Sequence, residues 1–157
     1  MAVKKLKFAQ EDLPDIQLVG IHTSLRDYRL AYFINKETGL RFERHDDLPV
    51  YDERNKLVKD YSFFSYYDPD KRTSYYLFSN DHETGKMIEQ YSQANFFLMI
   101  SENRSNDDLK AIQSKLRKIT TVNFVFEADI NKIKDIEGIL HDLELHLINR
   151  LVKIRQA

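Results

Sequence analysis

The sequence predicts an α+β fold with a single mixed, mostly antiparallel sheet. Three observations lead to this prediction: an aromatic hairpin in the middle of the chain, a strand-helix-strand unit on each side of it, and a long C-terminal helix. At 157 residues the chain has the size of a single domain. We therefore treat residues 1–157 as one α+β domain, with the sheet and two helices in 1–133 and the last helix in 134–157.

The first strand-helix-strand unit spans Ile16–Asp47. Its first strand is largely apolar on both sides, which is typical of a strand covered on both faces. Ser24 followed by Asp27 has the spacing of a capping box, so we expect the helix to begin after Ser24. Gly39 is well placed to end this helix in the left-handed conformation. An alternating strand follows from Leu40.

The middle of the chain combines a charged stretch with two aromatic runs. We expect residues 46–60 to form a loop, because this stretch is charged and irregular. The runs "YSFFSYYD" and "TSYYLFSND" are joined by "PDKR", in which Pro69 and Asp70 supply turn chemistry. They therefore predict a hairpin, which a polar loop at residues 80–86 follows.

The second strand-helix-strand unit covers Asn95–Ala128. Its apolar first strand leads to a second capping-box spacing, Ser105 and Asp108, and then to a clear amphipathic stripe. Strand, helix and strand with short links predict a right-handed crossover between parallel strands. We expect its core to combine residues of both strands and the helix: Phe97, Met99, Ile112, Leu116, Phe124 and Phe126.

Residues 134–157 predict a long helix with a broad apolar face. One stripe consists of Ile136, Leu140, Leu143, Leu147, Leu151 and Ile154, and it is widened by Leu145, Ile148 and Val152. This is more apolar surface than one sheet face needs. The helix could dock on its own sheet, or its extra surface could form a helix–helix seam in a homodimer.

Composition excludes several classes of protein. The net charge of −1 gives no global field that would attract nucleic acid or anionic lipid. The absence of cysteine excludes disulfides, thiolate nucleophiles and cysteine-based zinc sites. No apolar run has the length of a signal peptide or of a membrane span. We therefore expect a cytoplasmic protein that does not interact with membranes.

The aromatic hairpin is one candidate binding surface. Aromatic side chains on a sheet face can stack with the bases of single-stranded RNA or DNA, and Tyr66 and Tyr76 are the first candidates for this role. The alternative is that the aromatics fill the two faces of a sheet. The alternative is favoured, because neither aromatic run carries interleaved basic residues.

His22, Arg26 and Arg29 form a second candidate site. They lie at a strand end and at the N-terminus of the first helix, where an anion or small ligand could bind. The alternative is that the arginines are solvated or paired and that His22 bonds locally. We favour this alternative, because no glycine-rich loop precedes the helix. No cofactor or metal site is predicted, and no catalytic motif is present, so an enzyme is not favoured.

The run "LVGIHTSLRDYRLAYFIN" resembles the opening segment of the IPExxxVDY family, small uncharacterised bacterial proteins named after a motif in their later half. The resemblance covers roughly residues 14–130, with "KMIEQYSQANFFLMI" in place of the naming motif. Ile88 matches that motif, but Glu89 replaces Pro, Gln90 replaces Glu and residues 94–96 replace Val-Asp-Tyr. The resemblance implies a bacterial source and no particular activity. The lost acidic residues argue against a catalytic role for this region.

The sequence alone does not define a biochemical activity. The interpretation that we favour is a non-enzymatic cytoplasmic interaction module, which binds an unknown protein partner or a second copy through the C-terminal helix. The alternatives are a single-stranded RNA or DNA-binding domain that uses Tyr66 and Tyr76, and a small anion or ligand binder that uses His22, Arg26 and Arg29.

Overall fold

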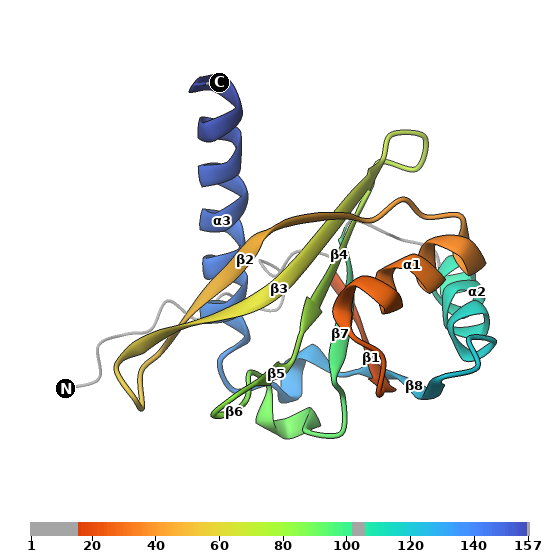
Figure 1. Ribbon diagram of the computed structural model, residues 1–157, viewed down its shortest axis with the longest axis horizontal. Helices are drawn as coiled ribbons and strands as arrows, with labels where there is room; N and C mark the ends of the chain where they lie inside the picture. The colour runs from red at the N-terminus through yellow and green to blue at the C-terminus, as the bar shows by residue number, and fades with distance from the viewer. Residues whose placement is uncertain (1–15, 102–105, 157) are drawn as a thin grey trace.

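Helices cover both faces of one six-stranded sheet (Figure 1). The computed structural model describes residues 16–101 and 106–156, with side chains placed for 16–101 and 108–149. α1 (Asp27–Thr38) and α2 (Asn106–Arg117) pack on one face, and α3 (Ile136–Gln156) packs on the other. The strands of the sheet are β1 (Ile16–Thr23), β2 (Glu43–Asp52), β3 (Leu57–Asp68), β4 (Thr73–Ser79), β7 (Phe96–Ser101) and β8 (Val122–Ala128). The predicted fold class is confirmed.

The strand order is β2-β3-β4-β7-β1-β8, and every neighbouring pair is antiparallel. β1, the first strand in sequence, therefore lies between two of the last strands, β7 and β8. These two strands are parallel to each other, as predicted, but they are not neighbours. With α1 and α2, the strands β8-β1-β7-β4 have the order and directions of a ferredoxin-like split β-α-β arrangement. β2 and β3 extend this arrangement on one side.

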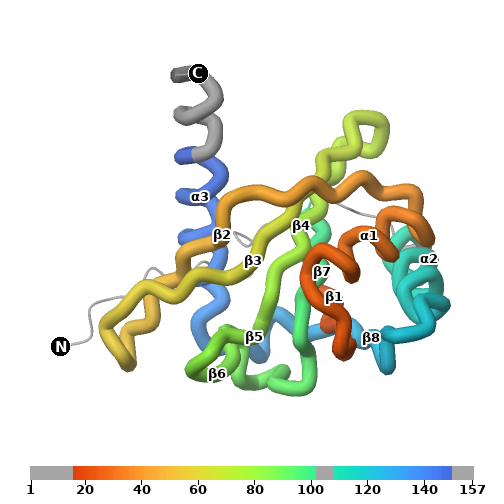
Figure 2. Tube along the Cα trace, in the orientation of Figure 1, coloured from red at the N-terminus to blue at the C-terminus, as the bar shows by residue number. Residues whose placement is uncertain are grey.

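The sheet separates two hydrophobic cores, because successive side chains of a strand point to opposite faces. In β1, Val19 and Ile21 face α1 and α2, whereas Leu18 faces the α3 side. The burial of both faces of β1 agrees with its apolar sequence. Figure 2 shows the trace of α1 and α2 on one side of the sheet and that of α3 on the other.

The core predicted for the second unit is only partly correct. Ile112 and Leu116 of α2 are buried in the first core, but Phe97 and Met99 point to the α3 side. The residues of β7 that face α2 are instead the alternate set, Phe96, Leu98 and Ile100. In β8 a register shift opposite His22 and Thr23 brings Val122 and Val125 to the α2 side. Phe124 is left 42% exposed.

The predicted cap of the first helix is wrong. α1 begins at Asp27 rather than directly after Ser24, and its N-cap residue, Arg26, makes no side-chain capping bond. The hydroxyl of Thr23 competes with this cap, since it accepts a hydrogen bond from the Leu25 amide (3.1 Å) and closes a local turn. The predicted C-terminal stop is confirmed: Gly39 has φ 78° and donates its amide to Asn35 O at 3.0 Å.

The stretch predicted as a loop, residues 46–60, forms most of a second hairpin, between β2 and β3. β2 is an edge strand, so one side of its backbone needs no strand partner and Pro49 is tolerated in it. Its charged residues other than Asp52 lie on exposed positions, and a register shift between His45 and Leu48 interrupts its alternation. The predicted aromatic hairpin, now β3 and β4, is confirmed.

The polar loop predicted at residues 80–86 contains a small hairpin of β5 (Asp81–His82) and β6 (Gly85–Lys86), and the 3₁₀ helix η1 (Glu89–Tyr91) follows it. The buried side chain of Asn80 holds this region together. Its amide nitrogen donates to Ile88 O and Ala94 O, and its carbonyl oxygen accepts the Ile88 amide at 2.7 Å. A second 3₁₀ helix, η2 (Ile130–Lys132), connects β8 to α3.

α3 docks on its own sheet, chiefly over β2, and the ring of His146 also contacts Phe63 of β3. Ile136, Ile139 and Leu143 are buried, and Leu140 and Leu147 pack partly against the same core. The predicted cap of α2 by Ser105 lies outside the described residues. The contacts of residues 150–157 lie outside the described side chains. Among the described helices, none is long and apolar enough to cross a membrane.

Both edges of the sheet are partly covered by side chains. On β2, the carboxylate of Asp142 accepts the Tyr51 amide at 3.3 Å, and Nε2 of His146 lies 2.9 Å from Asp46 O, both residues coming from α3. On β8, the guanidinium of Arg117 donates to Val125 O at 3.1 Å. Such contacts reduce the capacity of edge strands to pair with another chain.

Candidate functional site

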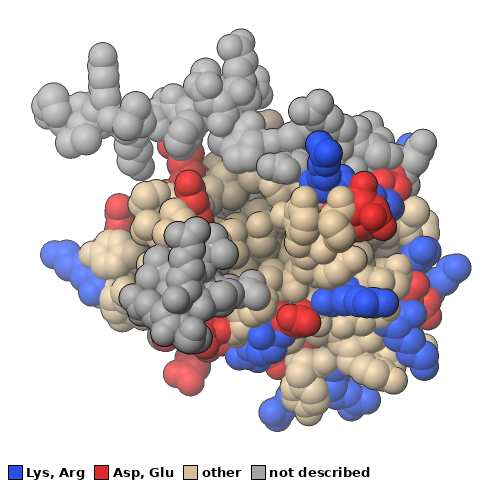
Figure 3. Space-filling view, turned by 90° about the horizontal axis from the view of Figure 1, so that it is seen from above, with Lys and Arg blue, Asp and Glu red and all other residues tan. Residues whose placement is uncertain are grey.

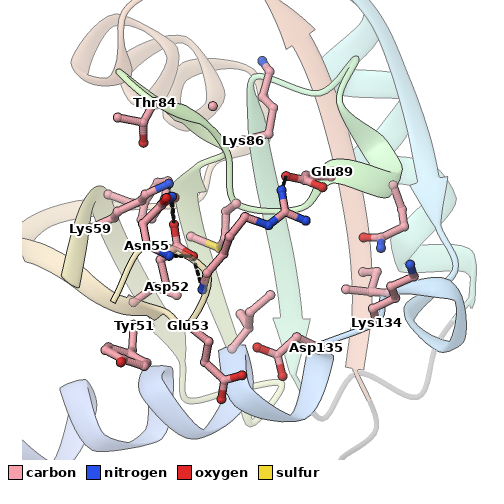
Figure 4. A pocket seen from close by; sticks show the side chains of 18 residues that line it. Tyr51, Asp52, Glu53, Asn55, Lys59, Thr84, Lys86, Glu89, Lys134 and Asp135 are labelled. Carbon is pink, nitrogen blue, oxygen red and sulfur yellow. Dashed lines mark hydrogen bonds and ion pairs between the residues drawn. The ribbon is translucent and has the colours of Figure 1, made fainter. Parts of the chain in front are cut away.

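A hollow of about 390 Å³ lies between the β2–β3 hairpin, the β5–β6 hairpin, η1 and the beginning of α3 (Figure 4). Three segments far apart in sequence, residues 50–61, 84–90 and 133–139, therefore meet around one space. Its lining includes the apolar residues Val50, Met87, Ile133 and Ile139. Charged residues of both signs complete the lining: Asp52, Glu53, Arg54, Lys59, Lys86, Glu89, Lys134 and Asp135.

Lys59 is the central charged group of this hollow. It is only 8% exposed, although it lies on the β2–β3 hairpin, and its Nζ lies 2.8 Å from Asp52 Oδ2 (Figure 4). Lysine is rarely buried without such a partner. The pair holds the two strands of the hairpin together beside the turn.

Asp52 has more partners than Lys59. Its carboxylate also accepts the Asn55 side-chain amide at 2.8 Å and the Arg54 backbone amide at 3.0 Å. Hydrogen bonds from Lys59 and Asn55 lower the pKa of Asp52 to about 2. The carboxylate is therefore ionised over the whole neutral range and organises the turn.

Tyr61 lies two residues from Lys59 on the same face of β3 and lines the hollow with it. Burial, with a smaller contribution from the charge of Asp52, raises the pKa of Tyr61 to about 12. Its hydroxyl is consequently neutral near pH 7 and can donate a hydrogen bond. At the rim, Arg54 and Glu89 form a weak, exposed ion pair at 3.8 Å.

A second surface feature is an aromatic strip of His22, Tyr91, Phe124 and Phe126 near the β8 edge. The ring of His22 stacks on Phe124 (5.0 Å between centroids), Phe124 is 5.8 Å from Phe126, and Phe126 is 5.5 Å from Tyr91. Gly20 makes room for this strip, since a Cβ there would lie 2.3 Å from the Phe126 ring. The strip lies on the side of the sheet that α3 covers only in part.

The structure does not group His22 with Arg26 and Arg29 through any described contact. His22 belongs to the aromatic strip, and its Nδ1 lies 3.0 Å from the Asn123 side-chain amide. Arg29 lies over the Phe33 ring at 5.9 Å, and Arg26 is exposed at the N-cap of α1. A ligand site formed by these three residues therefore remains a prediction. The described contacts of His22 are with the neighbouring side chains of Phe124 and Asn123.

Tyr66 and Tyr76 lie on opposite faces of the sheet. Tyr66 stacks on Tyr75 at 5.9 Å on the α1 and α2 side, and Tyr76 stacks on Phe63 at 5.9 Å on the α3 side. Both rings are partly buried against their cores. They therefore do not form one stacking platform, and the aromatics of the hairpin fill both faces of the sheet.

Sequence reasoning did not find Lys59 or the hollow, because the stretch around Lys59 was predicted as a loop. A signal was available in the alternation itself. Extending the β3 pattern backwards from Phe63 through Tyr61 places Lys59 on the same face. The other walls of the hollow come from distant segments, and no local pattern predicts that they meet.

The charges of the described surface are mixed, as the face in Figure 3 illustrates, with positive and negative side chains interspersed. Within residues 16–101 and 106–156, no group of three histidine or acidic side chains could hold a metal ion. No protein-family model, curated protein or solved structure matches the chain.

Proposed function

We propose that this protein is a non-enzymatic interaction module that binds a protein partner, or a second copy of itself, through the outer side of α3. The observation that carries the proposal is a second apolar stripe on that helix. Leu145 and Ile148 are 45% and 49% exposed, although the opposite side of the same helix is anchored in the core.

The two stripes of α3 point in different directions. At 3.6 residues per turn, Leu145 and Ile148 lie about 120–180° around the helix from Ile136. The contacts of Asp142 and His146 with β2 fix the rotation of the helix about its axis. The outer stripe consequently cannot turn into the core without breaking both contacts.

The spacing of the outer stripe suits a helical partner. His141, Leu145, Ile148 and, in the sequence, Val152 follow one another at intervals of four, three and four residues. Alternating intervals of three and four are the spacing with which one helix packs along another. A second copy of α3 carries the same stripe, so a homodimer is the simplest form of this interaction.

The same reasoning gives less support to the two alternatives. Single-stranded nucleic acid binding through Tyr66 and Tyr76 requires one aromatic face, whereas these rings lie on opposite faces. Ligand binding by His22, Arg26 and Arg29 is supported by no described contact that joins the three side chains. Membership of the IPExxxVDY family remains our prediction and adds no activity.

The test uses the double variant Leu145→Lys/Ile148→Lys, because removing α3 entirely would also remove Ile136, Ile139 and Leu143 from the core. Both substitutions are at exposed positions, so the fold should be retained. Light scattering over a range of concentrations measures the mass of the wild type and the variant. Affinity capture with each as bait compares any retained protein.

We expect a dimer, or a retained partner, that is lost in the double variant. The matched control is Leu57→Lys/Val58→Lys, which charges two exposed apolar residues of β3 and should leave association unchanged. A monomer at all concentrations, together with capture that does not depend on Leu145 and Ile148, would contradict the proposal.

A further inference from the structure

The hollow beside Lys59 has features of a binding site that are independent of the outer side of α3. A lysine ammonium has three N–H donors. Among the described residues its hydrogen-bonding partner is Asp52, whose carboxylate is shared with Arg54 and Asn55. A nearly buried cation with donors to spare therefore borders a space of about 390 Å³.

Other groups of the lining complement such a cation. The Tyr61 hydroxyl adds a neutral donor on the same strand face. Val50, Met87, Ile133 and Ile139 provide apolar surface from three different segments. The volume of the hollow falls within the roughly 300–1,000 Å³ of small-molecule sites, and its lining exposes more polar than apolar surface.

The charges at the rim restrict the ligand further. Lys86, Lys134 and Arg54 are balanced by Glu53, Glu89 and Asp135 around the same opening. A highly charged anion would meet these three carboxylates as well as the cations. A ligand with one negative charge and an apolar body avoids this repulsion.

We propose that the hollow binds a small monocarboxylate with an apolar side chain. The carboxylate accepts hydrogen bonds from Lys59 and Tyr61, and the side chain packs against Met87, Ile133 and Ile139. The Asp52 carboxylate keeps Lys59 in place and does not itself contact the ligand.

The probe for this site is N-acetyl-L-leucine, titrated into the full chain and followed by the backbone amide NMR signals. N-acetyl-L-leucinamide has the same shape without the charge, and inorganic phosphate has charge without the apolar body. We expect saturable shifts at millimolar N-acetyl-L-leucine around Lys59, Tyr61 and Met87, and at least about tenfold weaker binding of the amide and of phosphate.

Two variants separate binding from folding. Lys59→Met removes the cation and should weaken binding about tenfold or more. Met87→Glu leaves Lys59 intact and should abolish binding by placing a carboxylate in the apolar surface. The control Lys36→Met, on an exposed position of α1, should bind as the wild type does. Circular dichroism establishes that each variant is folded.

The proposal is overturned by any of four results with folded protein: no saturable shifts with N-acetyl-L-leucine, equal binding of the amide or of phosphate, unchanged binding in Lys59→Met, or unchanged binding in Met87→Glu. If Lys59→Met fails to fold, Met87→Glu and the amide comparison still decide the question.

Discussion

The two faces of the sheet are built from the same strands but are covered to different extents. α1 and α2 lie side by side over one face, where the core extends from β1 to the aromatic hairpin. Among the described residues, the long helix on the other face is α3, which lies mainly over β2. Two helices close a face, whereas one helix leaves room beside it. The hollow and the aromatic strip both occupy this room on the α3 side.

The closed face should dominate stability. Leu98 of β7 is fully buried in the core on the α1 and α2 side of the sheet. Leu98→Ala should therefore lower the free energy of unfolding by about 2–5 kcal/mol. Leu140→Ala, at a partly buried position of α3, should cost clearly less. Urea unfolding measures both variants. Equal losses would show that the two faces contribute alike.

Alkaline pH should affect both faces through one tyrosine on each. Burial raises the pKa of Tyr61 on the α3 face and of Tyr75 on the closed face to about 12. The unfolded chain loses these protons near pH 10, so stability is present below pH 10 and falls as pH rises towards 12.

Each tyrosine should account for about 2–3 kcal/mol of this loss. Ultraviolet absorbance of tyrosinate follows the titration in the wild type, in Tyr61→Phe and in Tyr75→Phe. Each variant should lack one late-titrating group. If either tyrosine titrates near its ordinary pKa, its hydroxyl is in contact with water rather than buried in that face of the sheet.

The strip at the β8 edge should be sensitive to its glycine. Gly20→Ala forces the Phe126 ring to move and should cost about 1–3 kcal/mol. The double variant Gly20→Ala/Phe126→Ala should cost less than the sum of the two single variants, because the clash is gone. Thermal unfolding gives the values. Additive losses would show that the ring and the glycine do not interact.

The contacts at the sheet edges should have the smallest effect. His146→Ala removes a hydrogen bond to Asp46 and the packing of the imidazole on Phe63, and should cost about 1 kcal/mol. Arg117→Ala, at the β8 edge, should cost no more than this, because Arg117 is exposed. A larger loss of stability in Arg117→Ala than in His146→Ala would show that the contact at the β8 edge contributes more than the contact at the β2 edge.

The parts of the fold that sequence predicted are those set by local patterns. The prediction of β1 and β7 from continuous apolar runs, of the left-handed stop at Gly39 and of the turn at residues 69–72 needs no knowledge of distant residues. The β2–β3 hairpin was missed because an edge strand with a wet face needs few apolar residues. The cap at Ser24 was wrong because Thr23 offered the backbone a competing partner.

The candidate site was less predictable than the fold. Lys59 becomes a buried cation only because α3, η1 and a small hairpin close around it. The outer stripe of α3 was visible in sequence as excess apolar surface at Leu145 and Ile148. Which stripe faces the core depended on Asp142 and His146, whose contacts to β2 lie far away in sequence.

The central place of β1 has a consequence for how the chain acquires its structure during synthesis. Gly20 is synthesised well before its partners Phe97 and Phe126. Until then β1 has two unpaired edges and two apolar faces. Such long-range pairing slows folding and leaves aggregation-prone apolar segments exposed until the partner strands are made. A chain cut before β8 should therefore aggregate rather than remain in solution as a folded fragment.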